Sequence, residues 1–435
     1  MNAADWNNKF GNDYLITLTN EERRYLALAP ISLECDSLVY HSKTNLWYTR
    51  VTAFFDGNTI IKVICETKRV LKDGNANYEN YVEYDTKLIT DNRTHLLPQN
   101  GRGKTKPLSA SNINAVTPFG CSLSIVFEAG NDTFLSLSNP RAYKKFPIGE
   151  WDTISEMRSD TDFHAFMKNY IATCKADYFE KLQAFQVAKK VTVKYKPGDI
   201  FRMDFDRTHY CYGIITADIK KLKAMQELPE KHSLRPLMTV PIMVRYYQLI
   251  TDNPNLKANE LCQVPLGRVN IVADNDIIWG THTIVDHKPL DPDDLEFNFV
   301  CTKIISHSPH ATVFTQDMFM RDGLIPKQEY MLYIEWGFAQ TSLSYEKMSD
   351  KLKEMMVDYR SPHGGVLLSI DPREATVNQK HRQRNSYKNN LLNSENREIL
   401  NEIFFCLGLN ADTTFDQFAK EFGGLSNYEI ISRMK

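Results

Sequence analysis

The sequence predicts an α+β protein, with a mixed N-terminal domain, a central β-rich domain that forms a small sheet or barrel, and a helical C-terminal part. β-branched and alternating runs dominate the first third and the middle of the chain, while capped helices close it. With 435 residues, of which 42% are hydrophobic, the chain is long enough for about three domains. The expected parts are a mixed domain at 1–155, a helical connector at 156–190, a β-rich domain at 191–310 and an α+β to helical region at 311–435.

The N-terminal domain is predicted to begin with a short helix. Thr19 and Glu22 have the spacing of a capping box, in which each side chain accepts a hydrogen bond from the backbone amide of the other residue. After this helix the sequence is rich in β-branched and aromatic residues, and it contains an Asp56-Gly57 pair that is typical of a tight turn between strands. Strands are predicted at 47–70 and 123–127, and a polar loop at 100–112.

A helical stretch separates this domain from the next. Apolar residues recur at helical spacing from Phe163 to Leu182, which predicts the connector helix. In the central domain, strands are predicted at 237–250, 266–272, 277–285 and 295–305. In the last part, helices are predicted at 345–359, at 395–407 with an end at Gly408, from a Thr413 cap, and from a Ser426/Glu429 capping box.

The charge balance argues against the simplest classes of partner. The formal net charge is −2, whereas a nucleic-acid-binding domain usually carries a basic excess. No stretch approaches the ~18 apolar residues of a membrane-spanning helix, and the first residues lack the pattern of a signal peptide. The eight cysteines form no CxxC pair, which is typical of free thiols in a reducing compartment. We therefore expect a cytoplasmic protein without membrane contact and without direct nucleic-acid contact.

Histidine and cysteine side chains are the candidates for chemistry. His209 and Cys211 alternate along one strand and could share a metal, but neither an HExxH nor a paired CxxC pattern is present. A metal-dependent or His-based hydrolase built near His209, His282 and His287 is the alternative interpretation, and the sequence does not reveal whether these three converge. We predict no catalytic residue, no bound metal and no cofactor.

A small basic cluster offers another alternative, a nucleic-acid-binding module. Its residues lie in the polar stretch after Thr376, where a solvated loop is the better interpretation of them. The cluster consists of Lys380, His381, Arg382 and Arg384.

Acidic residues gather in one turn of the central domain. Pro289 and Pro292 restrict the backbone there, so that several carboxylates are displayed together. A rigid acidic loop beside aromatic residues suits a basic protein partner, although an acidic run is also ordinary for a solvated turn. The predicted partner-binding residues are Asp286, Asp291, Asp293, Asp294, Glu296 and Tyr212.

A second motif opens the central domain, as Lys196-Pro-Gly-Asp-Ile-Phe-Arg202 followed by Tyr212-Gly213-Ile214. Gly198 can adopt backbone angles closed to other residues, which lets a strand begin sharply. Phe201 then alternates with polar neighbours and supplies a core face. The motif is therefore predicted to be a folding signature formed by Lys196, Pro197, Gly198, Asp199, Phe201, Arg202 and Gly213.

This motif resembles the KxGDIFR…YGxV pattern of the immunity protein 26 family, and the resemblance covers 191–305. Members of that family are encoded beside secreted polymorphic toxins of bacteria and are expected to bind and silence them. The resemblance implies a stoichiometric inhibitor rather than an enzyme. Its partner would be a cognate toxin that acts in the bacterial cytoplasm. The acidic turn would suit a toxin with a basic substrate groove, such as a nuclease, because carboxylates can mimic phosphates there.

Overall fold

The chain is described here from a computed structural model, which separates it into two compact units. The first unit comprises 1–193 with 204–208 and 279–281, and the second comprises 194–203, 209–278 and 282–435. The predicted α+β class is confirmed, because antiparallel sheets and helices occur together. The division at 155, 190 and 310 stays a prediction. The described residues are 15–32, 34–70, 76–98, 102–116, 118–128, 133–148, 157, 159–224, 240–295, 298–304, 314–315, 330–336, 339–353 and 397–434.

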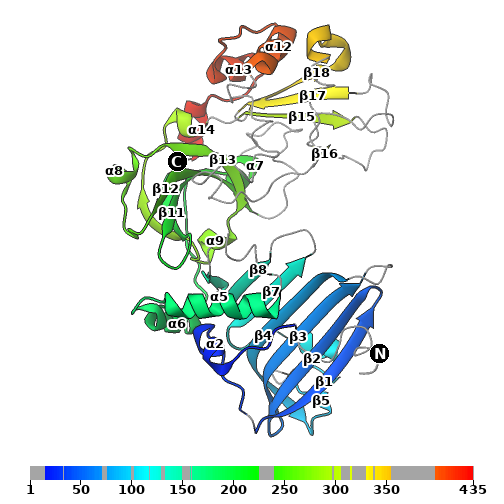
Figure 1. Ribbon diagram of the computed structural model, residues 1–435. Coiled ribbons are helices and arrows are strands. Elements are labelled where there is room, and N and C mark those ends of the chain that lie inside the picture. The colour runs from blue at the N-terminus through cyan, green and yellow to red at the C-terminus, as the bar shows by residue number, and fades with distance from the viewer. Residues whose placement is uncertain are drawn as a thin grey trace. The chain divides into compact units, whose positions relative to one another are not determined.

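The first unit is built on an antiparallel sheet of nine strands (Figure 1). Its main path runs β1-β2-β3-β4-β7-β8-β9, and β5 and β6 extend it from β4. Tight turns join β1 to β2 and β2 to β3, the second at Gly57 (φ 56°). The strands are β1 (Asp36–Thr44), β2 (Trp47–Asp56), β3 (Thr59–Val70), β4 (Ala76–Asp91), β5 (His95–Leu96), β6 (Lys106–Pro107), β7 (Ser122–Glu128), β8 (Phe134–Asn139) and β9 (Lys144–Phe146).

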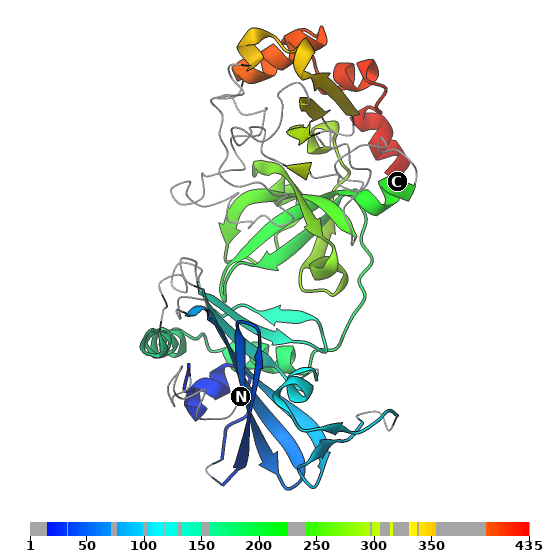
Figure 2. The same ribbon diagram turned by 90° about the vertical axis from the view of Figure 1, so that its right-hand side faces the viewer.

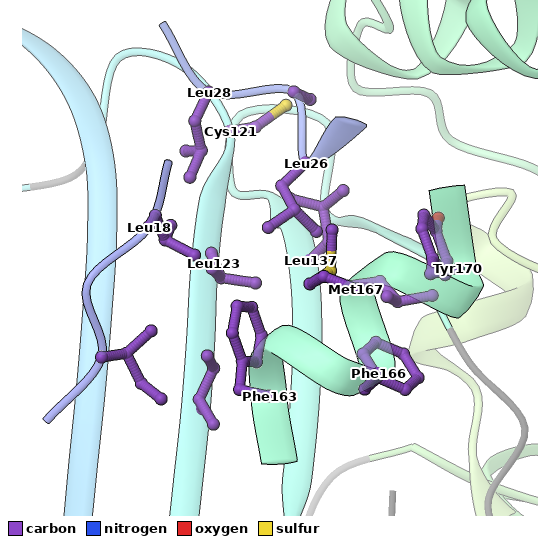
Figure 3. Close-up of a cluster of buried hydrophobic side chains, with 14 of the residues drawn as sticks. Leu18, Leu26, Leu28, Cys121, Leu123, Leu137, Phe163, Phe166, Met167 and Tyr170 are labelled. Carbon is purple, nitrogen blue, oxygen red and sulfur yellow. The ribbon is translucent and has the colours of Figure 1, made fainter. Parts of the chain in front are cut away.

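Helices cover one face of this sheet and form the largest core of the unit. The predicted connector stretch folds as α5 (Asp160–Ala172) and α6 (Tyr178–Gln186). Phe163 and Met167 of α5 pack against Leu123 and Leu137 of the sheet, as Figure 3 shows. The cluster also takes in residues beside α2 (Asn20–Tyr25), the short helix predicted from its capping box.

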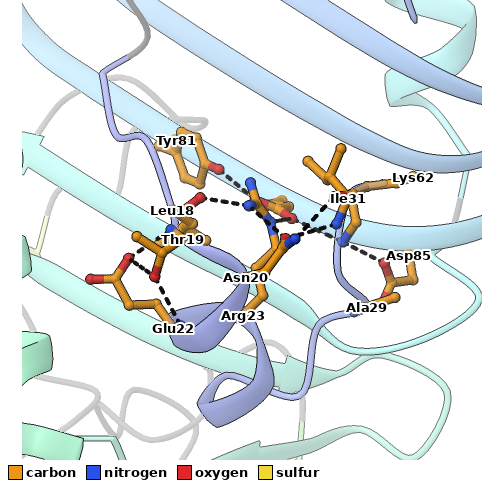
Figure 4. A network of polar contacts seen from close by, with 11 residues as sticks. Leu18, Thr19, Asn20, Glu22, Arg23, Ala29, Ile31, Lys62, Tyr81 and Asp85 are labelled. Atoms are coloured by element: carbon orange, nitrogen blue, oxygen red, sulfur yellow. Dashed lines mark hydrogen bonds and ion pairs between the residues drawn. The ribbon is translucent and has the colours of Figure 1, made fainter. Parts of the chain in front are cut away.

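A charged network lies between α2 and the same face of the sheet (Figure 4). Arg23 of α2 pairs with Glu83 of β4 at 2.8 Å. Lys62 of β3 pairs with Glu83 at 2.9 Å and with Asp85 at 2.6 Å, and the Tyr81 hydroxyl donates a hydrogen bond to Glu83 at 2.6 Å. Burial raises the pKa of Glu83, but Lys62 and Arg23 outweigh that effect and lower it overall, so the carboxylate is held ionised.

The stretch 100–112 is not the continuous loop that the sequence predicts. Its described part includes β6 and the start of α3 (Ala110–Asn114). The Ser109 hydroxyl caps α3 by accepting a hydrogen bond from the Asn112 amide, and Ala110 and Ile113 are buried in a second cluster on the sheet. Burial of two apolar residues on one helical turn outweighs the polar composition.

The second unit begins with a five-stranded antiparallel sheet in the order β13-β12-β11-β10-β14, and it is strongly bent (Figures 1 and 2). This agrees with the small, bent central sheet that the sequence predicts. Its elements are β10 (Asp199–Asp204), β11 (Tyr210–Asp218), α7 (Ile219–Ala224), β12 (Pro241–Thr251), α8 (Ala258–Leu261), β13 (Leu266–Ala273), α9 (Asn275–Ile278), β14 (Thr283–His287) and the 3₁₀ helix η1 (Pro292–Leu295).

The strand predicted at 277–285 is wrong in its first half. Residues Ile277 and Ile278 belong to α9, where both amides donate hydrogen bonds to the carbonyl oxygen of Asp274. Gly280 then reverses the chain with φ 67°, and β14 starts only at Thr283. The apolar Ile277-Ile278 pair is typical of a strand, but the hydrogen bonds to the Asp274 carbonyl and the reversal at Gly280 produce a helical turn instead.

A four-stranded sheet and helices complete the second unit, and its helices end largely as predicted. Trp336 and Phe404 stack between this sheet and the helices. Gly408 (φ 74°) ends α12, and Glu429 forms the predicted box with Ser426, whereas Thr414 rather than Thr413 caps α13. The elements are β15 (Asn298–Ile304), β16 (Phe314–Thr315), β17 (Tyr330–Trp336), β18 (Ala339–Ser344), η3 (Tyr345–Lys347), α12 (Arg397–Leu407), α13 (Phe415–Glu421) and α14 (Asn427–Met434).

The helix predicted at 345–359 is only partly covered by the described residues. A 3₁₀ turn occupies 345–347, residues 350–353 are helical, and 354–359 lie outside the described residues. Among the helices that are described, none combines the length and the apolar character needed to span a membrane.

Candidate functional site

The motif at the start of the second unit forms a tight entry into β10. Gly198 has φ 93°, in the left-handed region that favours glycine. Its amide donates a hydrogen bond to the Ile215 carbonyl oxygen at 2.7 Å, and its carbonyl accepts one from the Lys288 amide at 2.8 Å. A Cβ at this position would lie 2.4 Å from the Lys288 carbonyl oxygen. The glycine therefore lets the chain pass between β11 and the segment after β14.

Asp199 secures the same turn from within. Its Oδ2 accepts a hydrogen bond from the Lys196 amide at 2.9 Å, while its own amide donates to the Lys196 carbonyl at 3.1 Å. Its Oδ1 lies 2.9 Å from His287 Nδ1, across the β10–β14 pair. Pro197 fixes one backbone angle between these residues. The polar residues of the motif thus serve the turn itself.

The apolar part of the motif is a packing unit around Phe201. The Phe201 ring is buried and stacks on His282, with ring centroids 5.6 Å apart and planes 8° apart. The Phe201 and Tyr246 rings pack edge to face, with ring centroids 5.9 Å apart. The ring also occupies the space next to Gly213, where a Cβ would come within 2.5 Å of Phe201 Cζ.

Arg202 and Tyr212 hold the loop after β12. Arg202 Nη1 donates a hydrogen bond to the Pro254 carbonyl at 2.9 Å. The Tyr212 hydroxyl donates to the Asn253 carbonyl at 2.7 Å and accepts from the Leu256 amide at 3.2 Å. Tyr212 is buried, and burial raises its pKa. Tyr212, predicted to bind the partner, therefore lies inside the sheet and holds the loop after β12 through its hydroxyl.

Two of the three candidate histidines, His282 and His287, take separate partners. His282 stacks on Phe201 just before β14, whereas His287 at the end of β14 faces Asp199. The Cys211 side chain is buried in β11. No group of three or more metal-ligating side chains gathers anywhere in the described ranges. The basic cluster at 380–384 lies outside the described residues.

The acidic turn is built as the 3₁₀ helix η1, and its carboxylates have different roles. Asp294 is 4% exposed; its Oδ2 accepts a hydrogen bond from the Asp291 amide at 2.9 Å and pairs with Lys288 Nζ at 3.2 Å. The Asp291 side chain is 70% exposed and also lies 3.2 Å from Lys288 Nζ. Asp293 is exposed. One carboxylate thus organises the turn while two face the solvent.

Asp286, another of the predicted acidic residues, is not part of this turn. Asp286 lies in β14, where its carboxylate accepts hydrogen bonds from the amides of Ala258 and His287. These two bonds lower its pKa. Glu296 lies outside the described residues. The exposed acidic surface therefore reduces to Asp291 and Asp293 among the residues that can be placed.

Three residues that sequence analysis missed hold η1 in position. Arg245 Nη1 donates a hydrogen bond to the Asp293 carbonyl at 2.8 Å, and Asn427 Nδ2 donates to the Pro292 carbonyl at 2.9 Å. Burial lowers the pKa of Lys288, but Asp294 and Asp291 outweigh that effect and raise it overall, so the ammonium remains charged beside the turn. The Pro-Asp-Asp sequence gave no signal of the two carbonyl contacts, because both donors are distant in sequence.

These features define an α+β protein whose central motif packs within the second unit and whose acidic turn exposes Asp291 and Asp293 to solvent. Residues 196–310 match the model of the immunity protein 26 family, which confirms the resemblance that the motif indicated. The matched segment begins at the turn of Lys196 and includes the five-stranded sheet and η1. Comparisons with curated proteins and with solved structures give no significant match.

Proposed function

We propose that this protein is the immunity partner of a polymorphic toxin, which it neutralises by binding it stoichiometrically in the bacterial cytoplasm. The family match over 196–310 carries this proposal, because that family implies an immunity protein with a toxin partner. The same family favours a binder rather than an enzyme. The structural use of the motif supports this, since Asp199, Phe201 and Arg202 are each engaged in packing or backbone contacts.

The acidic turn is the proposed contact. Asp291 and Asp293 extend into solvent from a backbone held by Arg245, so they are presented in a fixed arrangement. Exposed charges of this kind accelerate association with a partner of opposite charge. A toxin with a basic groove, such as a nuclease, is the partner that this surface suits.

The hydrolase alternative has less support. It required His209, His282 and His287 to work together, but His282 and His287 have separate structural partners. The nucleic-acid-binding alternative depended on the basic cluster at 380–384. The formal net charge of −2 disfavours it, because a nucleic-acid-binding domain usually carries a basic excess.

Co-expression with the toxin encoded beside this gene tests the proposal. We expect the two proteins to co-purify at a fixed ratio and the cells to survive toxin induction. A double Asp291→Asn/Asp293→Asn variant should bind with a slower association rate and a weaker salt dependence. Asp412→Asn is the matched control, because that side chain is 87% exposed and lies outside the family match. Survival without any complex formation would contradict the proposed mechanism.

A further inference from the structure

Helix α14 completes the core of the matched segment although it lies outside that segment. Ile430 and Met434 are buried in one cluster with Ala217, Met243 and Leu295. Both views place α14, in red, beside the five-stranded sheet (Figures 1 and 2). Leu295 is the last residue of η1, so the acidic turn and the helix share this core.

The first residue of α14 reaches the acidic turn directly. Asn427 is 3% exposed, and its Nδ2 donates the hydrogen bond to the Pro292 carbonyl at 2.9 Å. Its Oδ1 is buried without a hydrogen-bond partner among the described residues. Leaving a buried amide oxygen without a hydrogen bond costs free energy, which the contact made by Nδ2 only partly offsets. That contact is with η1, one residue before the carbonyl that Arg245 holds.

The next residue of the same helix faces outward. Tyr428 is 66% exposed, which is high for a large aromatic side chain next to a buried neighbour. Tyrosine contributes strongly to binding at protein interfaces because it offers a large rigid ring and a hydroxyl. Tyr428 follows Asn427 directly, so the helical turn that carries this exposed ring is the one that contacts η1.

We propose that α14 is part of the toxin-binding face, with Asn427 positioning the acidic turn and Tyr428 contacting the toxin beside it. The identity of the partner rests on the proposed function. The acidic charge beside the aromatic ring selects a basic protein surface, where arginine or lysine can pair with the carboxylates and pack on the ring.

The role of Asn427 is tested on the free protein. In Asn427→Ala, we expect amide hydrogen exchange to rise at η1, where the Asp294 amide is bonded to the Asp291 carbonyl, relative to amides of β11 and β12. Asn427→Asp, which keeps the shape but loses the donor, should give the same local increase. Exchange at η1 that matches the parent in both variants overturns the positioning role.

The role of Tyr428 is tested with the toxin encoded beside the gene. Tyr428→Ala should keep the melting temperature and η1 exchange of the parent and weaken binding by about 10- to 100-fold. Phe405→Ala is the matched control, because that ring is 72% exposed on α12, whose buried residues belong to another cluster. Unchanged affinity in Tyr428→Ala overturns the contact. A parent protein that does not bind the toxin overturns the proposed function together with the role of Tyr428, whereas the exchange measurement still decides the role of Asn427.

Discussion

The Phe201 ring fills the space that a side chain at position 213 would need, since a Cβ on Gly213 would approach Phe201 Cζ to 2.5 Å. The two residues lie on the neighbouring strands β10 and β11. Glycine weakens a strand because it packs nothing, and an aromatic ring laid over it restores the lost contacts. The IFR and YG parts of the motif are therefore one packing arrangement.

Phe201→Ala should destabilise the second unit. The ring is 1% exposed and contacts His282 and Tyr246, so its loss leaves a cavity that costs about 3–5 kcal/mol. Urea unfolding, with a probe in each unit, measures the effect. A soluble variant that unfolds like the parent but no longer protects cells would show instead that Phe201 belongs to a recognition surface.

Gly198→Ala should be more damaging than Gly408→Ala, and Gly198→Val more damaging still. Both glycines have positive φ, so each substitution pays about 1–2 kcal/mol for the left-handed backbone. Only at Gly198 would the added Cβ also meet a backbone oxygen, at 2.4 Å, whereas Gly408 has nothing within 4 Å. Comparing the two unfolding free energies separates the clash from the backbone cost. Equal losses at both sites would contradict this explanation.

The first unit should lose stability as pH rises through the titration of His164. Its Nδ1 lies 2.7 Å from Glu22 Oε1, and its Nε2 lies 3.5 Å from Asp160. Burial lowers the His164 pKa, but Glu22 and Asp160 outweigh it and raise the pKa overall. The folded state then holds a proton that the unfolded chain has released, so the stabilisation is complete below the ordinary value near ~6.5 and disappears above the raised value. Urea midpoints between pH 5.5 and 8.5 should show this slope in the parent and not in His164→Gln.

Glu83→Gln should destabilise the first unit far more than Glu79→Gln. Glu83 is fully buried and pairs with both Arg23 and Lys62, and removing one member of a buried network costs about 3–5 kcal/mol because the remaining charges lose their compensation. Glu79 pairs with Lys68 at 2.7 Å nearer the surface, where such a pair is worth about 0–1 kcal/mol. Thermal unfolding of the two variants compares them directly, and similar losses would argue that the buried network relaxes.

The purified protein should carry no stoichiometric transition metal and show no turnover of its own. In the part of the chain that the structure describes, metal-ligating side chains do not gather in groups of three or more, and a binder needs none. Elemental analysis and melting curves with and without a chelator provide the check. A tightly bound metal near one equivalent, or a melting temperature that falls on chelation, would revive the metal-dependent hydrolase.

Features that depend on neighbouring residues were predictable from sequence. The capping boxes of Thr19/Glu22 and Ser426/Glu429 form as expected, because both partners lie within one helical turn. The Gly198 turn was likewise readable from its local pattern. Only part of the acidic turn could be predicted from the sequence. Prolines marked its rigidity, but the burial of Asp294 depends on how η1 packs, and the Asn427 contact crosses 135 residues.

The distance in sequence between η1 and α14 also affects folding during synthesis. The cluster that contains Met243 and Leu295 also needs Ile430 and Met434, so the sheet cannot finish packing when its own strands leave the ribosome. Synthesis at about 5–20 residues per second delays the arrival of α14 by roughly 7–27 s, given the 135 residues between Pro292 and Asn427. During that interval the nascent sheet exposes an unfilled apolar surface that chaperones can bind. A transcript cut short between these two points would yield a protein with an open core, suited to degradation rather than to protection.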